Sequence, residues 1–129
     1  MRIRQNSKLI AIVDDDESVL RSLQDLIESD GLTAMCFGSS EQFLDSDARD
    51  TAACLIADIQ MPGMSGLELQ QTLKAERCEI PIIFITAHGD AKVRTCAMRD
   101  GAVELLDKPF DDAVLLGIVH AVVESSRNG

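Results

Sequence analysis

Five short apolar runs, separated by longer segments with a helical pattern, constrain the fold of this chain more than any other feature. The runs are Leu9–Val13, Leu32–Phe37, Ala53–Ala57, Pro81–Ile85 and Ala102–Leu106. Each is too short for a typical helix, and most lack the alternation of polar and apolar residues expected of a strand with one face in water. Such runs are typical of strands buried on both faces, as in a parallel sheet covered by helices.

The segments between and after the runs are predicted to form helices. These helices are expected at Glu17–Asp30, Ser40–Leu44, Leu67–Ala75, Asp90–Arg99 and Asp111–Val123. In the first, apolar residues recur on one helical face, Asp16 is placed to cap the start, and Gly31 follows the end. Five successive strand–helix units with right-handed crossovers predict an α/β fold: a five-stranded parallel sheet, doubly wound (βα)5, flavodoxin-like.

Length and charge limit the classes of function. A chain of 129 residues fits one domain, so we expect a single domain over residues 1–129 with its core at about residues 8–124. The net charge of −10 argues against direct binding of nucleic acid by this chain. No apolar run approaches the roughly 20 residues that a membrane span requires. We therefore expect neither a nucleic-acid-binding nor a membrane-spanning chain.

The cysteines indicate a reducing compartment. The four cysteines contain no CxxC pair, and with only two histidines the spacing of a zinc site is missing. Cys36 and Cys54 lie in apolar runs and are predicted to be small buried residues. Since unpaired thiols persist in a reducing environment, we expect a cytoplasmic protein.

Charged and hydroxyl side chains follow four of the apolar runs. In doubly wound sheets, ligands bind beyond the carboxyl ends of the strands, where the strand order reverses. At these positions the chain carries Asp14–Glu17, Asp58, Thr86–Ala87 and Lys108–Pro109. Any one of them has an ordinary explanation as a helix cap, a turn or a surface residue. Taken together, they predict a functional site at one edge of the sheet.

The acidic residues point to a magnesium site. If the first and third strands are neighbours, Asp14, Asp15 and Asp58 lie within a few ångströms of one another. Like charges at that separation raise a carboxyl pKa or destabilise the fold unless a cation lies between them. Carboxylate oxygens suit Mg²⁺, which takes few protein ligands. A carboxylate nucleophile, a metal ion, the Lys108 ammonium and the Thr86 hydroxyl together are what phosphoryl transfer needs.

The segment after Asp58 is predicted to be a structured loop. In Asp58–Gly66, Pro62 fixes a turn, the glycines permit unusual φ values, and Ser65 is placed to cap the next helix. The backbone carbonyl of Gln60, two residues past Asp58, would reach the same metal ion.

Four motifs follow one another along nearly the whole chain. They are residues 12–16 (IVDDD), 58–66 (DIQMPGMSG), 81–90 (PIIFITAHGD) and 101–110 (GAVELLDKPF). In this order they resemble the receiver domain of two-component response regulators, the CheY-like fold, from Ile10 to about Val123. The third and fourth motifs are most similar to the FixJ-like branch, whose members usually carry a C-terminal helix-turn-helix.

The resemblance implies a phosphoacceptor and a metal site. Asp58 would take a phosphoryl group from a histidine kinase. Asp15, Asp58 and the Gln60 carbonyl would bind Mg²⁺ directly, and Asp14 would act largely through water. The chain would then be a signalling domain rather than an enzyme, self-phosphorylating with slow autodephosphorylation, and linked to transcription regulation.

The resemblance also implies a switch. Thr86, with its neighbour Ala87, and Lys108 would bind the phosphoryl group, and the Lys108–Pro109 bond would be cis. Leu105 stands where the family usually places Tyr or Phe. Leucine has neither ring nor hydroxyl, so this position departs from the usual switch.

The last helix is apolar around most of its circumference, from Ala113 to Val123. An amphipathic surface helix needs only one apolar stripe. Since the family uses its fourth and fifth helices for dimerisation or effector contact, the resemblance implies a homodimer through the last two helices.

Two alternatives remain on sequence alone. The first is a phosphorylation-independent pseudo-receiver that serves as an interaction module. The second is a haloacid-dehalogenase-type phosphatase with Asp14 as nucleophile and Asp16 as general acid/base, but it lacks a cap segment and leaves the Asp58 loop unexplained. A nucleotide-binding Rossmann domain is disfavoured because the first turn carries acids where a glycine-rich phosphate cradle is needed.

Overall fold

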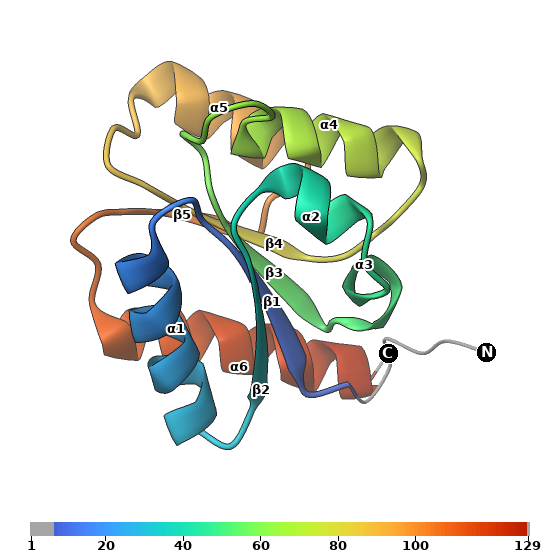
Figure 1. Ribbon diagram of the computed structural model, residues 1–129, viewed down its shortest axis with the longest axis vertical. Helices are drawn as coiled ribbons and strands as arrows, with labels where there is room; N and C mark the ends of the chain where they lie inside the picture. The colour runs from blue at the N-terminus through green and yellow to red at the C-terminus, as the bar shows by residue number, and fades with distance from the viewer. Residues whose placement is uncertain (1–6, 129) are drawn as a thin grey trace.

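A parallel sheet of five strands, in the order β2-β1-β3-β4-β5, forms the centre of the molecule (Figure 1). The computed structural model describes residues 7–128, so the two ends of the predicted domain, residues 1–6 and 129, lie outside the described residues. The strands are β1 (Leu9–Val13), β2 (Thr33–Phe37), β3 (Cys54–Asp58), β4 (Ile82–Thr86) and β5 (Glu104–Asp107). The helices are α1 (Glu17–Ser29), α2 (Ser40–Leu44), α3 (Ala48–Thr51), α4 (Gly66–Ala75), α5 (Ala91–Arg99) and α6 (Asp112–Asn128). The predicted fold class is confirmed.

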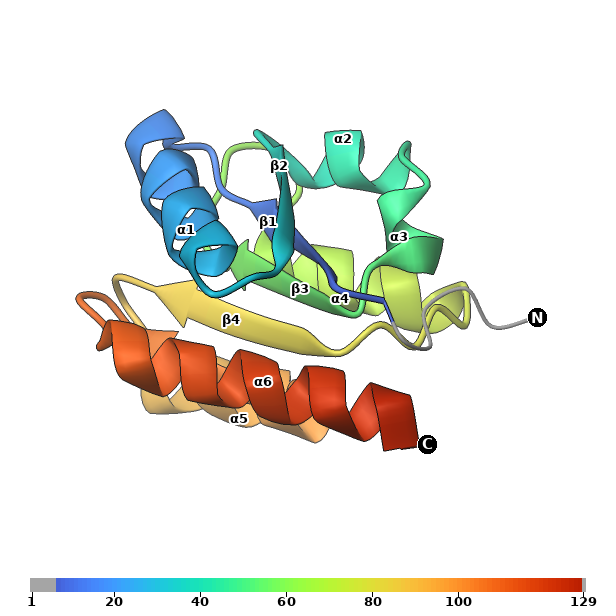
Figure 2. The same ribbon diagram turned by 90° about the horizontal axis from the view of Figure 1, so that it is seen from below.

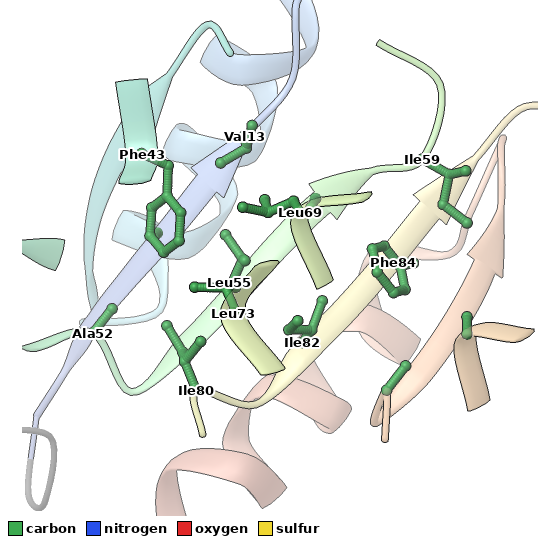
Figure 3. Packing of buried hydrophobic residues seen from close by; sticks show 14 of the residues in the cluster. Val13, Phe43, Ala52, Leu55, Ile59, Leu69, Leu73, Ile80, Ile82 and Phe84 are labelled. Atoms are coloured by element: carbon green, nitrogen blue, oxygen red, sulfur yellow. The ribbon is translucent and has the colours of Figure 1, made fainter. Parts of the chain in front are cut away.

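Helices cover both faces of the sheet. Helices α1 and α6 lie on one face, and α2, α3, α4 and α5 lie on the other (Figure 1). Figure 2 shows α6 running alongside β4. On the other face, Leu69 and Leu73 of α4 pack with Leu55 of β3 and Ile82 of β4 (Figure 3). None of the helices in the described part of the chain is long and apolar enough to span a membrane.

Side-chain caps fix where several helices begin. The Asp16 carboxylate accepts hydrogen bonds from the backbone N–H groups of Ser18 and Val19, which confirms the predicted cap of α1. Ser65 and Glu68 form a reciprocal capping box at the start of α4, so the predicted Ser65 cap is also confirmed. These caps fix where α1 begins after β1 and where α4 begins after the loop that follows β3.

The strand boundaries differ from the sequence prediction by up to two residues. Strands β3 and β4 extend through Asp58 and Thr86, which therefore end their strands rather than follow them. Strand β5 begins at Glu104, because the N–H of Ala102 is used to close the last turn of α5 on the Ala97 carbonyl. The four-residue helix α3 is not predicted, since it is too short to show a period.

The prediction that the strands are buried on both faces is wrong for the two edge strands, β2 and β5, since Asp107 at the end of β5 is exposed and only Leu105 of β5 is buried. Strands β1, β3 and β4 are buried almost throughout, whereas Thr33 and Met35 of β2 are exposed. Strand β2 is an edge strand with a neighbour on one side only. For the same reason Cys36 is half-buried rather than buried, while Cys54 in the sheet interior is fully buried as predicted.

Candidate functional site

The strand order places three carboxylates at one edge of the sheet. Because β1 and β3 pair directly, with Val13 opposite Ala57, Asp14 and Asp58 leave the sheet side by side. Carboxylate oxygens of Asp14, Asp15 and Asp58 all lie within 4.8 Å of one another. We call these three residues the acidic cluster. The sequence-based expectation that they converge agrees with this placement.

Hydrogen bonds orient the two buried carboxylates of the cluster. Asp14 is 1% exposed and Asp58 is 7% exposed, while Asp15 lies at the surface. Oδ1 of Asp14 accepts the N–H of Asp16 at 2.9 Å, and Oδ1 of Asp58 accepts the N–H of Gln60 at 3.1 Å. Each carboxylate therefore keeps its other oxygen, Oδ2, for partners at the centre of the site.

Lys108 supplies that partner. Its Nζ donates to Oδ2 of Asp58 at 3.0 Å and to Oδ2 of Asp14 at 3.3 Å. Its backbone is fixed as well, since the Lys108 N–H donates to the Thr86 carbonyl at 2.8 Å and the Lys108–Pro109 bond is cis. One ammonium group therefore balances part of the charge of two carboxylates.

The site shifts the pKa values of its charged groups. Burial, with a smaller contribution from the charge of Asp58, raises the pKa of Asp14 above its ordinary value, although the Asp16 N–H and Lys108 act in the opposite direction. For Lys108, burial lowers the pKa, but the hydrogen bond to Asp58 and the two nearby carboxylates outweigh it and raise the pKa. Lys108 is thus held charged, and a charged Asp14 is disfavoured unless more positive charge is added.

The hydroxyl and the nearby loop complete the edge. Thr86 is fully buried, and its Oγ1 accepts the N–H of His88 at 3.2 Å. Ala87 and His88 are exposed. Leu105 is 2% exposed, so the residue at the predicted switch position lies in the core. A Cβ on Gly89 would lie 2.9 Å from Cγ2 of Thr86 and 3.1 Å from Cδ2 of Leu105, so the loop packs tightly on both side chains.

The loop after β3 returns closely to its own strand. We call residues 59–65 the β3–α4 loop; its first and last turns are joined by the hydrogen bond from the Gly66 N–H to the Ile59 carbonyl at 2.8 Å. A Cβ on Gly66 would lie 2.4 Å from the Asp58 carbonyl oxygen, so only glycine fits there. Gln60, whose carbonyl is predicted to bind metal, is exposed in this loop.

The donor set of the acidic cluster fits Mg²⁺. Its described groups are carboxylate oxygens, with no histidine or cysteine among them. Hard oxygen ligands of this kind suit Mg²⁺ rather than softer metals. The raised pKa of Asp14 is consistent with a site that is short of positive charge.

Comparison with known proteins decides the family. A model of the response regulator receiver domain matches residues 10–120. The chain belongs to this family. Receiver domains are signalling modules of two-component response regulators rather than enzymes, so the haloacid-dehalogenase-type phosphatase alternative is no longer supported.

Named relatives place the receiver domain among regulators of the FixJ-like branch. It is 44% identical to Nodulation protein W of Bradyrhizobium diazoefficiens over 119 residues, covering 92% of this chain and 52% of the relative. It is 43% identical to the response regulator protein TodT of Pseudomonas putida, again covering 92% and 52%. The crystal structure of FixJ-N matches with a TM-score of 0.81 and 38% identity, covering 90% of this chain and 93% of that one. The receiver domain therefore spans about half the length of the curated relatives it matches.

Sequence reasoning missed two residues of the receiver domain that hold the site's surroundings. Arg94 of α5 donates to the Leu105 carbonyl at 3.0 Å and to Asp107 at 3.2 Å. Ser40 of α2 donates to the Met64 carbonyl at 3.1 Å. Both contacts join residues at least 11 positions apart, and no spacing in the sequence signals them.

Replacing Asp14 by Asn should stabilise the metal-free receiver domain at neutral pH. Because the folded-state pKa of Asp14 is raised above 3.8, the unchanged protein loses stability as pH rises through the interval between 3.8 and that raised value. The Asp14→Asn variant has no such titration. Its free energy of unfolding should match that of the unchanged protein at low pH and exceed it by on the order of 1 kcal/mol at pH 7.

Urea denaturation in EDTA at several pH values measures this difference, with Asp25→Asn on the exposed surface of α1 as control. If the free energy of unfolding of Asp14→Asn, minus that of the unchanged protein, were smaller at pH 7 than at pH 4, the raised pKa of Asp14 would be contradicted.

Proposed function

We propose that this receiver domain accepts a phosphoryl group on Asp58 from a histidine kinase in a Mg²⁺-dependent reaction. The observation that carries the proposal is the buried Asp58 carboxylate, 3.0 Å from the Lys108 ammonium and within 4.8 Å of two further carboxylates. A structural salt bridge has no need of two additional acids. A site for a divalent cation and an anionic group does.

The groups of the chain have distinct roles in the transfer. An Asp58 carboxylate oxygen attacks phosphorus in line, and an O–P bond forms while the N–P bond to the donor's imidazole breaks. The electron pair of the broken bond passes to the imidazole nitrogen, which takes a proton from solvent. The product on Asp58 is an acyl phosphate. The ammonium of Lys108, released from Asp58, pairs with a phosphoryl oxygen, and the Thr86 hydroxyl donates to another.

The metal site uses the same cluster. Asp15, Asp58 and the Gln60 carbonyl would bind Mg²⁺ directly and Asp14 through water; when bound, the ion neutralises charge on the phosphoryl oxygens. The geometric support is the acidic cluster itself, whose charge exceeds what Lys108 balances.

The surface beside Lys108 supports a protein as the phosphoryl donor. A groove of about 350 Å³ lies between α1 and the segment after β5. It is lined by Val19 and Leu26 of α1 and by Pro109 and Phe110 next to Lys108. An apolar groove adjoining a charged site is the kind of surface on which an amphipathic helix of a partner protein packs.

Dimerisation through the last two helices is part of the proposal. Val114 of α6 is 50% exposed, Met98 of α5 is 39% exposed and Val103 between them is 37% exposed. Val103 and Val114 also line a groove of about 790 Å³ beside β5. Phosphorylation would act by favouring a conformation in which this surface binds a second copy. Control of transcription through a segment beyond this chain is also part of the proposal; a relative named transcriptional regulatory protein FixJ, of which the chain covers 53%, supports it.

The test is incubation with acetyl phosphate and Mg²⁺, followed by intact-mass measurement and light scattering. The chain should gain the mass of one phosphoryl group. It should show no gain when EDTA replaces Mg²⁺ during the incubation. The phosphorylated chain should form a dimer. No gain of mass in Mg²⁺ would favour the pseudo-receiver alternative and overturn the phosphoacceptor proposal. A gain of mass without a change in oligomeric state would overturn only the dimer.

A further inference from the structure

Ser40 is a fully buried polar residue with a partner far away in the sequence. It is the first residue of α2, and its hydroxyl donates to the carbonyl of Met64, in the β3–α4 loop, at 3.1 Å. A buried hydroxyl is retained at such a position only if its hydrogen bond is made. This bond joins α2 to the loop that carries Gln60.

The β3–α4 loop packs on the core through Ile59, Met61 and Met64, but it has few other polar attachments. Its ends are joined by the Gly66–Ile59 hydrogen bond, and the Ser65 N–H donates to Glu68 at the start of α4. Across residues 7–128, the structure gives no other hydrogen bond from outside β3 and α4 to residues 60–65. The Ser40 hydroxyl is therefore the polar group from outside β3 and α4 that fixes this loop, at Met64 near its α4 end, to the rest of the molecule.

The same turn of α2 touches the loop at a second place. A Cβ on Gly63 would lie 3.0 Å from Oε2 of Glu41. With φ of +74°, Gly63 also needs glycine for its backbone conformation. The loop thus lies against the start of α2 at two neighbouring residues, Gly63 and Met64.

The junction between β2 and α2 holds the other side of the acidic cluster as well. The carbonyl of Phe37, the last residue of β2, accepts the N–H of Asp14 at 3.1 Å. The junction is itself braced, because the Gly38 N–H donates to Gln42 at 3.0 Å and Ser39 caps α2. Residues 37–40 therefore hold the backbone next to Asp14 on one side and the β3–α4 loop on the other.

We propose that Ser40 is a positioning residue for the metal site. By holding Met64, its hydroxyl keeps the β3–α4 loop in the conformation from which the Gln60 carbonyl reaches the cation, at a fixed place relative to Asp14 and Asp58. This inference rests on the proposed function. Loss of the bond lets the loop sample other conformations, and Mg²⁺ binding must then reorder it.

The test is the Mg²⁺ dissociation constant of Ser40→Ala, measured by calorimetry, together with hydrogen exchange of the loop amides. One buried hydrogen bond is worth about a fivefold change in an equilibrium constant, so the dissociation constant should rise about fivefold. Amides of residues 60–65 should exchange faster, while the phosphorylation rate at saturating Mg²⁺ stays near that of the unchanged protein. Ser40→Thr, which keeps a hydroxyl, should restore most of the affinity.

Ser46→Ala is the matched control. Ser46 follows α2, donates to the Phe43 carbonyl at 2.8 Å and accepts the Ala48 N–H at 3.2 Å, so this variant loses two hydrogen bonds without touching the loop. Its Mg²⁺ affinity should not change. Unchanged affinity in Ser40→Ala, or an equal loss in Ser46→Ala, overturns the inference and leaves the proposed function in place. An unchanged protein that neither binds Mg²⁺ nor gains a phosphoryl group overturns the proposed function and this inference with it.

Discussion

The Asp58→Asn variant should gain no phosphoryl group from acetyl phosphate and Mg²⁺ under conditions that phosphorylate the unchanged chain. The amide is nearly the same size as the carboxylate, so it should keep the loop and the core in place. Its oxygen is a poor nucleophile and cannot form an acyl phosphate. Because the O–P bond depends on this one atom, we expect complete loss of the mass increase rather than a reduced rate. Intact-mass spectrometry reads the result directly.

A surface variant makes the comparison specific. Asp47 is exposed before α3 and makes no side-chain cap, so Asp47→Asn makes the same chemical change away from the site. It should be phosphorylated like the unchanged protein. Persistent labelling of Asp58→Asn would mean that another carboxylate, such as Asp14, accepts the phosphoryl group, and the assignment of Asp58 would fail.

The convergence of the acidic cluster follows from sequence because it depends on the backbone alone. Once the apolar runs predict parallel strands, residues at their carboxyl ends meet at one edge, whatever the side-chain details. Asp14 and Asp58 come together through the pairing of β1 with β3, and Lys108 reaches them from the end of β5. The pattern was therefore sufficient to place these residues at one edge of the sheet, while the pairing of β1 with β3, on which the predicted convergence was conditional, is given by the structure.

Features that depend on neighbours distant in sequence were not predictable. The predicted burial of β2 and β5 was wrong because an apolar run does not reveal whether its strand lies at an edge of the sheet. The contacts of Ser40 with Met64 and of Arg94 with the Leu105 carbonyl need the packed structure. Serine and arginine at these positions have ordinary explanations as a helix start and a surface charge.

Leu105 shows how the packed structure changes a sequence-based interpretation. The sequence identified it only as a position without the usual ring. In the fold its side chain is buried and packs next to Gly89, and its backbone carbonyl accepts a hydrogen bond from Arg94. The position that lacks the usual ring is therefore a filled core position, and the Arg94 contact joins α5 to β5 at this point.

Replacing Lys108 by Met should cause the largest loss of stability among single changes at the site. The variant keeps an extended side chain but leaves Asp14 and Asp58 facing each other without a cation. Removing one partner of a buried ion pair costs about 3–5 kcal/mol; with about a quarter of the Lys108 side chain exposed, we expect about 2 kcal/mol in metal-free buffer at pH 7. The raised pKa of Lys108 has the matching sign, since its stabilising effect is present at pH 7 while Asp14 and Asp58 are ionised, and is lost as pH rises from its ordinary pKa of 10.5 through the raised value.

The pH and metal dependence of this loss distinguish charge from packing. Without Lys108 the pKa of Asp14 should rise further, so the deficit relative to the unchanged protein should shrink as pH falls and the carboxyls become protonated. Mg²⁺ should also restore part of the stability, because it places positive charge between the same carboxylates.

Lys74→Met is the control. The exposed Lys74 ammonium pairs with Asp100 at 3.4 Å, and its loss should cost no more than about 0.5 kcal/mol at either pH. Urea denaturation of the unchanged protein and both variants at pH 4.5 and pH 7, each with EDTA or with Mg²⁺, measures the free energy of unfolding under these four conditions. A deficit independent of both pH and Mg²⁺ would mean that Lys108 acts by packing alone, and that the acidic cluster has no need of added positive charge.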